Sequence, residues 1–426
     1  MIRFALIAVF AIACRDAKPA PPAAPAPWSD AWLLAQGTTF LTDTTARRAA
    51  LESSLTNPSN MYSRIRLAAY GLGTGGWDQL PVWNPRSVPV DAESAQILAR
   101  GEMPVLPGDR PPLWNGVTPT TMPEWVALGR RVFFEYPMRA EVFMEWGLTQ
   151  RELIDDVGVE RTAAGDIPGL VVFKNIDGDT RVGITCAICH STVKNGEVVV
   201  GQARRTFNYG KLRVTYDRVH GTLASEKEGR RLESWGAGRA DVTEDDDEDP
   251  VAIPDLWGER SQRFLTQVGA IRHDSPLALA IRQETQLTDS NHALVRPPRE
   301  LAWALAMFVY SLQPPAHTAP ASPRGAALFA EHCAHCHANA VYGGTTIAAA
   351  TIGTDPALAT GRGRGTGKYR VPTLLGVAAG APYLHDGSVR SLDELLSPTR
   401  TIRGHRAGTN LDADDRAALI AHLQTL

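Results

Sequence analysis

Cys186-Ala-Ile-Cys189-His190 and Cys333-Ala-His-Cys336-His337 are two copies of one five-residue frame, and together they use four of the five cysteines in the chain. Two thiols at this spacing can bond to the two vinyl groups of one porphyrin while the histidine binds its iron. The alternative is a tetrahedral zinc site built from two Cys-x-x-Cys hooks, which leaves both histidines without a function. The sequence therefore predicts two covalently bound haem c groups. We expect the four cysteines to attach them, with His190 and His337 as proximal ligands.

The chain around the two frames contains one structural unit twice. In each copy a Gly-x-x-x-Phe segment precedes the frame, Pro-x-Leu-x-Gly and His-Asp follow it, and an apolar stretch at helical spacing closes the unit. The matching segments are Gly129–Phe133 and Gly325–Phe329, Ile253–Gly258 and Val371–Gly376, His273-Asp274 and His385-Asp386, and residues 301–312 and 417–426. We expect each closing helix to pack on the helix that opens its unit.

The predicted fold is mainly α: two tandem cytochrome c-like haem domains with long loops, over residues 119–314 and 320–426, plus an N-terminal extension over residues 28–118. A bound haem replaces much of the apolar core that such small domains would otherwise need. The extension opens with a predicted helix around residues 28–55 and then becomes rich in Gly, Pro and Trp. The tryptophans of this later part are expected to be packing anchors or a lid over a haem; they are Trp77, Trp83 and Trp114.

The first residues resemble a bacterial lipoprotein signal. A short basic start and an apolar run over residues 4–13, too short to span a bilayer, precede Cys14. We expect residues 1–14 to act as the signal and Cys14 to be lipidated in a periplasmic protein, with a plain cleaved signal as the alternative. By analogy with such signals, Arg15 weakly favours the outer membrane. Residues 15–27, rich in Pro and Ala, would be an extended linker from that membrane.

Composition limits the classes of partner. The chain has 426 residues, of which 44% are hydrophobic and 21% charged, and this suits a globular protein of two or three domains. Its formal net charge is -3, so there is no charge field to suggest a nucleic acid partner.

The sixth ligand of each haem iron decides its chemistry, because an open position admits oxygen or peroxide. Met307 is the last methionine in the chain, so no methionine of the second domain can be the sixth ligand of the second haem. His292 and His405 lie at matching distances before the ends of the two closing stretches. We therefore expect both to be distal ligands. The alternatives are His220 in the first domain and His385 in the second, or surface positions for His292 and His405.

These residues resemble the bacterial dihaem cytochrome c peroxidase superfamily, which includes the methylamine-utilisation dihaem enzyme and the rubber-cleaving dihaem oxygenases. The resemblance covers about residues 120–426. Leu128–Glu135 looks like the opening helix of the first haem domain, and Ala381–Ser388 looks like the loop at the haem edge of the second. Gly404–Thr409 is similar to the branch whose second haem is bis-histidine. In the peroxidases the matching His-Asp-Gly lies beside the haem, which argues against His385 as a ligand.

The resemblance implies that one haem relays electrons and the other reacts with peroxide or oxygen. An acid group over the open iron assists O–O cleavage. Glu284 lies near the place where the peroxidases carry such a glutamate, so we expect it to be catalytic, with a helix-surface glutamate as the alternative. The acidic run over residues 244–249 could hold Ca²⁺, as the peroxidases do between domains, and the alternative is a solvated loop.

The chain departs from the peroxidases in two ways. His273-Asp274-Ser275 stands where they often have Trp-Asp-Gly, so an electron relay between haems would shift to Trp257 or Trp303, both also readable as core residues. Histidine in place of methionine also lowers the potential of the second haem.

Three functions remain open at this point. The first is a dihaem c-type cytochrome with electron-transfer and peroxidase-type activity, and the second is a pure electron carrier with two bis-histidine haems. The third is a dihaem oxygenase acting on an apolar organic substrate. The expected partners are a small redox protein as electron donor or acceptor, peroxide or oxygen, and a membrane reached through the lipid anchor.

Overall fold

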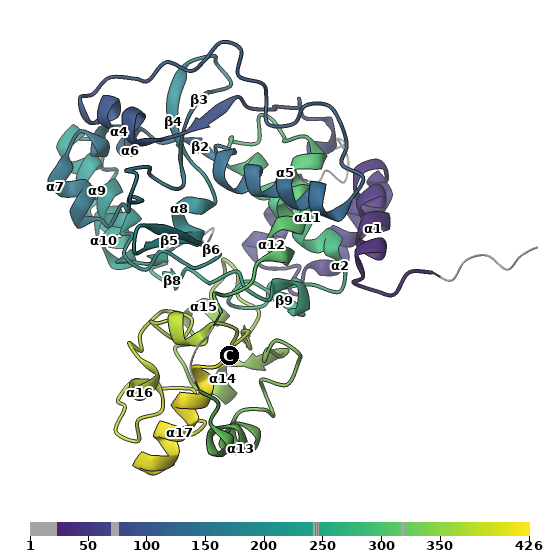
Figure 1. Ribbon diagram of the computed structural model, residues 1–426, viewed down its shortest axis with the longest axis vertical. Helices are drawn as coiled ribbons and strands as arrows, with labels where there is room; N and C mark the ends of the chain where they lie inside the picture. The colour runs from purple at the N-terminus through teal and green to yellow at the C-terminus, as the bar shows by residue number, and fades with distance from the viewer. Residues whose placement is uncertain (1–23, 70–75, 242, 244, 246, 317–319) are drawn as a thin grey trace, which may run out of the picture.

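The computed structural model describes residues 24–69, 76–241, 243, 245, 247–316 and 320–426, and Figure 1 shows their arrangement. The chain after residue 320 lies below the rest in this view. Cys14, the whole signal segment and most of the Pro/Ala-rich linker lie outside the described residues. Export and lipidation therefore stay predictions.

Two helix pairs frame the two parts of the chain. Helix α5 (Met122–Glu135) packs on α12 (Arg299–Ser311), and α13 (Pro323–His332) packs on α17 (Ala413–Leu423). Each pair joins a predicted opening segment to a predicted closing stretch, so this prediction is confirmed. A capping box at Thr121 starts α5, and the side chain of Ser322 caps α13.

A glycine allows each helix pair to approach closely. A Cβ atom added to Gly129 would lie 1.9 Å from the Ala304 carbonyl oxygen, and one added to Gly325 would lie 2.0 Å from that of Ala418. The two glycines occupy matching places in the repeat. The same backbone-to-backbone contact is therefore built twice.

The two Pro-x-Leu-x-Gly segments end in matching turns that meet between the two parts. Gly258 and Gly376 have φ of 75° and 69°, the left-handed region that favours glycine, and each precedes a short 3-10 helix. A Cβ on Gly376 would lie 2.4 Å from the Trp257 ring, and one on Gly258 would lie 3.1 Å from Leu375. The two equivalent segments of the repeat therefore contact each other here.

A four-stranded antiparallel sheet was not predicted. Its order is β1 (Ser87–Pro89), β3 (Leu170–Lys174), β4 (Thr180–Ile184) and β2 (Arg139–Ala140). The first strand comes from the N-terminal extension, and the others lie between α5 and the first cysteine frame. The extension is therefore built into the same fold.

The predicted helix around residues 28–55 is wrong in one respect, because it is two helices. Helix α1 (Asp30–Thr42) ends at Asp43, whose extended backbone breaks the run and whose carboxylate accepts a hydrogen bond from Ala46 N to start α2 (Thr44–Ser54). Of the three tryptophans predicted to be packing anchors or a lid, Trp77 is buried in the largest apolar cluster, and Trp83 and Trp114 are partly buried against another. All three are packing residues.

The extension also holds the C-terminal part. Met61 N and Tyr62 N donate to the carbonyls of Arg362 and Gly363 at 3.0 and 2.9 Å. These bonds tie α3 to a loop of the second unit.

The remaining elements complete the fold. They are α3 (Met61–Ala69), η1 (Gly76–Gln79), α4 (Ala92–Ala99), α6 (Val142–Leu148), α7 (Arg151–Asp156), α8 (Ala187–His190), β5 (Ser191–Lys194), β6 (Glu197–Val200), α9 (Tyr209–His220), α10 (Glu226–Trp235), β7 (Arg239–Ala240), β8 (Val251–Ala252), η2 (Glu259–Ser261), β9 (Phe264–Leu265), β10 (Ile271–Arg272), α11 (Pro276–Asp289), β11 (Thr346–Ala348), α14 (Ala349–Ile352), α15 (Ala357–Thr360), β12 (Lys368–Arg370), η3 (Val377–Ala379) and α16 (Leu392–Leu395).

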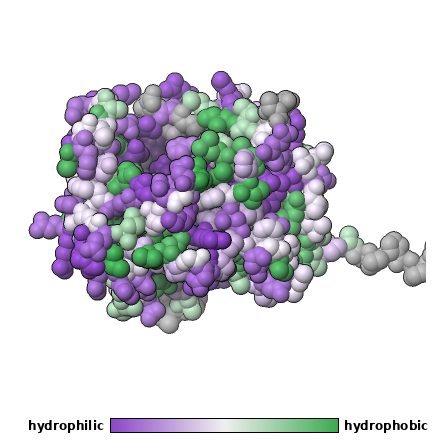
Figure 2. Space-filling model, turned by 90° about the horizontal axis from the view of Figure 1, so that it is seen from above, coloured by the Kyte–Doolittle hydropathy of each residue, from purple (hydrophilic) through white to green (hydrophobic). Residues whose placement is uncertain are grey.

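The surface carries mixed polarity. Figure 2 shows a face on which hydrophobic groups lie in separate patches among hydrophilic side chains. None of the described helices combines the length and the apolar character needed to cross a bilayer.

Candidate haem-binding sites

The first cysteine frame forms one turn of helix. Helix α8 (Ala187–His190) follows directly on Cys186, so both thiols and the imidazole lie on one short segment. Burial raises the pKa of Cys186 to about 11 and that of Cys189 to about 12. The four described cysteines are free of disulfides. Both thiols of this frame are therefore neutral and available for a covalent bond.

The two histidines predicted to be proximal ligands are held alike by backbone carbonyls. His190 Nδ1 lies 3.1 Å from the Pro254 oxygen, and His337 Nδ1 lies 2.7 Å from the Tyr342 oxygen. Because a carbonyl only accepts, Nδ1 carries the hydrogen in both rings and Nε2 keeps its lone pair. Burial also lowers the pKa of each to about 4. Both imidazoles are thus neutral, which is the form that binds a metal.

The structure brings His405 to His337. Their ring centroids are 6.4 Å apart. Two metal–imidazole bonds of about 2 Å each, with about 1.1 Å from nitrogen to ring centre on both sides, place two ring centres about 6.2 Å apart across one metal ion. The observed distance therefore matches two imidazoles that share an iron.

The loop that carries His405 is fixed by its own backbone contacts. His405 has φ of 47°, and its N–H donates to the Ile352 oxygen at 2.9 Å. The buried Arg400 side chain donates to the carbonyls of Gly404 and His405 at 2.7 and 2.8 Å. His405 Nδ1 is buried without a hydrogen-bond partner, and burial lowers the pKa of this histidine. An unpartnered buried imidazole opposite a proximal histidine fits a haem ligand.

No comparable partner faces His190 among the described histidines of the first unit. His292 is exposed in a left-handed turn after α11, so the structure does not bring it to His190. His220 is exposed, with its Nδ1 on the Tyr216 carbonyl of its own helix, while both nitrogens of the buried His273 are hydrogen-bonded. The structure therefore gives no support to His292 or His220 as a distal ligand.

Met138 is a residue that sequence reasoning missed. It is partly buried against two apolar clusters, one of which also packs against Cys186 and the other against Cys189. Its side chain therefore shares apolar surroundings with both cysteines of the first frame. The signal was present in the sequence, because the segment follows directly on the opening helix.

Glu284 lies in a buried ion cluster. Its Oε1 is 3.3 Å from Nε of Arg299, and Arg299 and Arg47 both pair with Asp78 of the extension. Burial raises the pKa of Glu284, and Arg299 is the largest opposing influence. The structure thus places Glu284 at a contact with the N-terminal extension, which gives its predicted catalytic role no support.

The positive charge of Arg282, on α11, influences the pKa values of the first frame. Burial is the main cause of the pKa shifts of Cys186 and His190, and the positive charge of Arg282 acts on both groups. Arg282 and Glu284 are two positions apart on α11, so they point to different sides of the helix. Arg282 was not singled out from the sequence, and the catalytic role of Glu284 stays a prediction.

The two candidate relay tryptophans differ in position. Trp257 is fully buried, donates to the Val200 oxygen at 3.1 Å and contacts Gly376 between the two parts. Trp303 is also fully buried, but it stacks on Phe40 of the extension with 5.5 Å between centroids. Of these two tryptophans, Trp257 is the one at the contact between the two units.

The acidic run gathers carboxylates without forming a recognisable metal site. Asp241, Asp245 and Asp249 approach Thr243 Oγ1 at 2.7, 3.1 and 3.3 Å. Burial, with the charges of Asp241 and Asp245, raises the pKa of Asp249 to about 7. In the described part of the chain, which leaves out two residues of the run, no group of three or more His, Cys, Asp or Glu side chains could hold a metal ion. Calcium stays a prediction.

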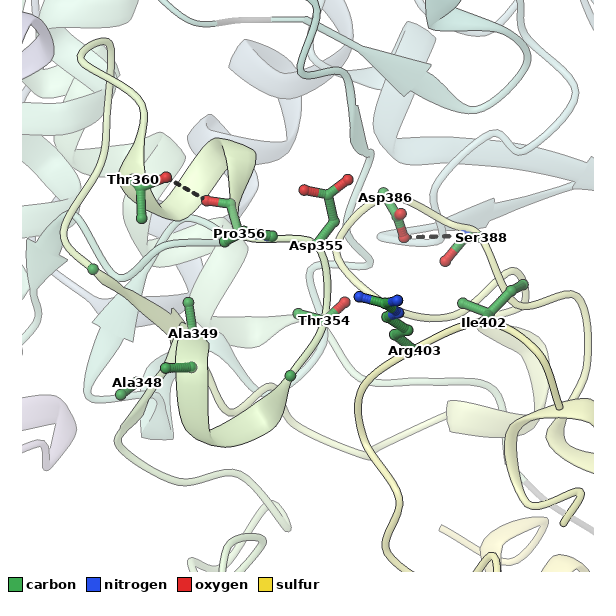
Figure 3. Close-up of a pocket in the computed structure, with 13 residues that line it drawn as sticks. Ala348, Ala349, Thr354, Asp355, Pro356, Thr360, Asp386, Ser388, Ile402 and Arg403 are labelled. Atoms are coloured by element: carbon green, nitrogen blue, oxygen red, sulfur yellow. Dashed lines mark hydrogen bonds between the residues drawn. The ribbon is translucent and has the colours of Figure 1, made fainter.

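A cavity of about 740 Å³ lies beside the loop that leads to His405 (Figure 3). Its lining includes Thr354, Asp355, Asp386, Ser388 and Arg403. None of the cysteines or histidines of the two frames lines it.

A comparison with protein families finds a match in the second unit. Residues 367–405 match a family described as RoxA-like, cytochrome c-like. This segment includes the second Pro-x-Leu-x-Gly, His385 and His405, so the match confirms the superfamily resemblance there. A cytochrome c-like segment also implies haem c as the cofactor. No curated protein matches the chain.

Two solved structures are similar at low identity. One is a MauG-like protein associated with microbial copper homeostasis, with 20% identity, a TM-score of 0.33, and 46% of this chain and 79% of that chain covered. The other is the Kuenenia stuttgartiensis hydrazine synthase pressurised with xenon, with 15% identity, a TM-score of 0.36, and coverage of 76% and 98%.

Proposed function

We propose that the chain is a periplasmic dihaem c-type cytochrome, with one haem domain around each cysteine frame, that passes electrons to a peroxide-reducing site. The observation that carries the proposal is the 6.4 Å pairing of His337 with His405. This pairing supports two histidine ligands for one haem, whereas no second histidine among the described residues of the first unit faces His190.

The second haem is the electron-transfer site. Ligands on both sides leave no coordination position for a substrate, and two imidazoles favour a low potential. The loop of His405 is fixed through Arg400, so the distal ligand changes little in position when the iron changes its oxidation state.

The first haem is the reactive site. Haem iron with an open position supplies peroxide or oxygen chemistry. The chain itself supplies three contributions around it. The Pro254 carbonyl fixes the tautomer of His190, buried apolar residues limit water, and Arg282 adds a positive charge that acts on Cys186 and His190.

The contact between the paired glycine turns suggests a path for electron transfer between the two haems. Trp257 lies in the apolar cluster against which Cys186 packs, and it also contacts Gly376 of the second unit. We infer that electrons cross between the units at this contact, which needs no mobile carrier.

A second candidate is an oxygenase that acts on an apolar organic substrate. The match of residues 367–405 to a RoxA-like family favours it. The pure carrier is a third candidate, and it requires a sixth protein ligand on the first haem, for which Met138 is the residue best placed.

The spin states of the two haems test the proposal. The protein is produced in an export-competent host that assembles c-type haem, and its oxidised and half-reduced forms are examined by electron paramagnetic resonance. We expect one low-spin bis-histidine haem and one high-spin haem that reacts with hydrogen peroxide. Two low-spin haems that ignore peroxide would support the carrier, and oxygen uptake with an apolar substrate would support the oxygenase.

Three variants assign the ligands. His405→Ala is expected to convert the low-spin haem to high spin, whereas the control His292→Ala leaves both spectra unchanged. Met138→Leu is expected to leave the high-spin haem unchanged. If Met138→Leu instead converts a low-spin first haem to high spin, the first site is not open.

Location and partners complete the proposal. The lipid anchor at Cys14 and a small redox protein as donor are both predicted from the sequence. Cys14→Ser is expected to release the protein from membranes without changing its haem spectrum.

A further inference from the structure

Tyr310 and His273 form a buried hydrogen-bonded pair that the proposed function does not use. Tyr310 Oη lies 2.5 Å from His273 Nε2, and the side chains are only 5% and 3% exposed. His273 follows β10, and Tyr310 lies near the end of α12. The contact joins two elements far apart in the sequence.

The direction of this hydrogen bond follows from the other ring nitrogen. His273 Nδ1 lies 2.8 Å from the Gln262 carbonyl oxygen, which can only accept. Nδ1 therefore carries the hydrogen, and Nε2 has a free lone pair that accepts from the phenol. The Tyr310 proton is already aimed at a base.

Deprotonation of Tyr310 without oxidation is unfavourable, because burial raises the pKa of its phenol well above the usual value. Burial likewise lowers the pKa of His273. The nearest charges are balanced, since Glu259 pairs with Arg370 at 2.9 Å. Proton transfer becomes favourable only if the phenol loses an electron at the same time, because its acidity then rises steeply.

Two tryptophans lead from the pair towards the surface. The Trp28 ring lies 5.1 Å from His273 and 5.8 Å from Tyr310, edge-on to both, and 5.5 Å from Trp32. Arg260 binds the Trp28 carbonyl and lies 3.2 Å from Asp30, so the N-terminal segment is held over the pair. Both tryptophans are only partly buried.

The pair lies across α12 from the apolar cluster against which Cys186 packs. Phe308 and Leu312, on either side of Tyr310 along α12, belong to the apolar cluster against which Cys186 packs. Tyr310 faces the cluster on the other side of the helix. A helix with its side chains is about 10–12 Å across, so α12 is the barrier that an electron would cross between the two clusters.

We propose that Tyr310 and His273 are a redox-active pair, in which Tyr310 gives one electron to a one-electron oxidant while its phenolic proton moves to His273 Nε2. The O–H bond breaks, an N–H bond forms, and the products are a neutral tyrosyl radical and a histidinium. Trp28 and Trp32 continue the path, so that an electron from a surface donor can restore Tyr310 as the proton returns. The natural oxidant would be the oxidised first haem, and this part rests on the proposed function.

The second unit offers a matched control. His385 is the repeat equivalent of His273, and its Nε2 lies 3.2 Å from Tyr369 Oη. The Tyr369 hydroxyl, however, also bonds to the Asp355 carbonyl. Its proton is therefore directed to a group that cannot take it, and we expect Tyr369 to be inactive.

The test oxidises the haem-loaded full chain with a flash-generated ruthenium(III) polypyridyl complex and records freeze-quenched electron paramagnetic resonance spectra. We expect a tyrosyl radical that is lost in Tyr310→Phe, retained in Tyr369→Phe and reduced in yield in His273→Gln. In unaltered protein exchanged into D₂O, the radical should couple to one deuteron from the hydrogen bond. A tyrosyl signal that persists in Tyr310→Phe, the absence of any tyrosyl signal, or a radical without deuteron coupling would overturn the proposal.

A second arm replaces the ruthenium complex with hydrogen peroxide. If peroxide produces the same tyrosyl radical, this result supports the first haem as the natural oxidant. A radical with ruthenium(III) but none with peroxide retains the pair and counts against the peroxide-reducing function, so the two failures are distinguishable.

Discussion

Alanine at either helix-crossing glycine is expected to destabilise the protein strongly. The added Cβ would lie 1.9 Å from the Ala304 oxygen in Gly129→Ala and 2.0 Å from the Ala418 oxygen in Gly325→Ala. Each contact is with backbone, so the helix pair must separate by at least about 1 Å to reach ordinary contact. Overpacking of this kind costs about 1–3 kcal/mol or more, whereas helix propensity returns at most about 1 kcal/mol. The net expected loss is about 2 kcal/mol at each site.

Urea unfolding of the haem-loaded protein, followed by far-ultraviolet circular dichroism and by haem absorption, measures this loss. Gly108→Ala is the control, because nothing lies within 4 Å of a Cβ there, and it is expected to change stability by less than about 0.5 kcal/mol. If either helix-crossing variant is as stable as this control, the close packing of its helix pair is wrong. If only one is destabilised, the two units do not share one construction.

Two further outcomes follow from buried charges. The pKa of Asp249 is about 7 in the folded protein and near 3.8 in the unfolded chain, so its ionisation lowers stability as pH rises from about 4 to about 7. In thermal unfolding, Asp249→Asn should therefore be as stable as the parent at pH 4 and more stable at pH 8 by about 1 kcal/mol, a value reduced because the site is half exposed. Calcium should stabilise the parent at pH 8 if the predicted ion binds. Equal stability of parent and variant at pH 8 would contradict the raised pKa of this carboxylate. Glu284→Gln breaks the buried pair with Arg299 and should cost about 3 kcal/mol in urea unfolding, with peroxide turnover per folded molecule unchanged. Lost turnover at unchanged stability would restore Glu284 as a catalytic group.

The duplicated parts of the fold could be predicted because their residues are set by local geometry. A glycine at a helix crossing, a glycine in a left-handed turn and a Cys-x-x-Cys-His frame each tolerate few substitutes, so they remain visible in both copies. Gly129 with Gly325, and Gly258 with Gly376, show this directly. The same comparison singled out His405, which the structure brings to His337.

The parts that could not be predicted depend on contacts between distant segments. Strand β1 pairs with β3, which is far away in the sequence, and its three residues have no pattern of their own. His292 occupies the place that matches His405, yet it is exposed, because the first unit has different surroundings there. The ion pair of Glu284 with Arg299 likewise had no signal in the sequence, because the two residues lie on different helices.

The haem content of one chain tests the central claim most directly. Intact mass and a pyridine haemochrome assay on protein from an export-competent host should give two haem equivalents per chain, both retained after denaturation because thioether bonds to the four cysteines hold them. A mass equal to the bare polypeptide, apart from any lipid, with no haemochrome spectrum, would contradict the account.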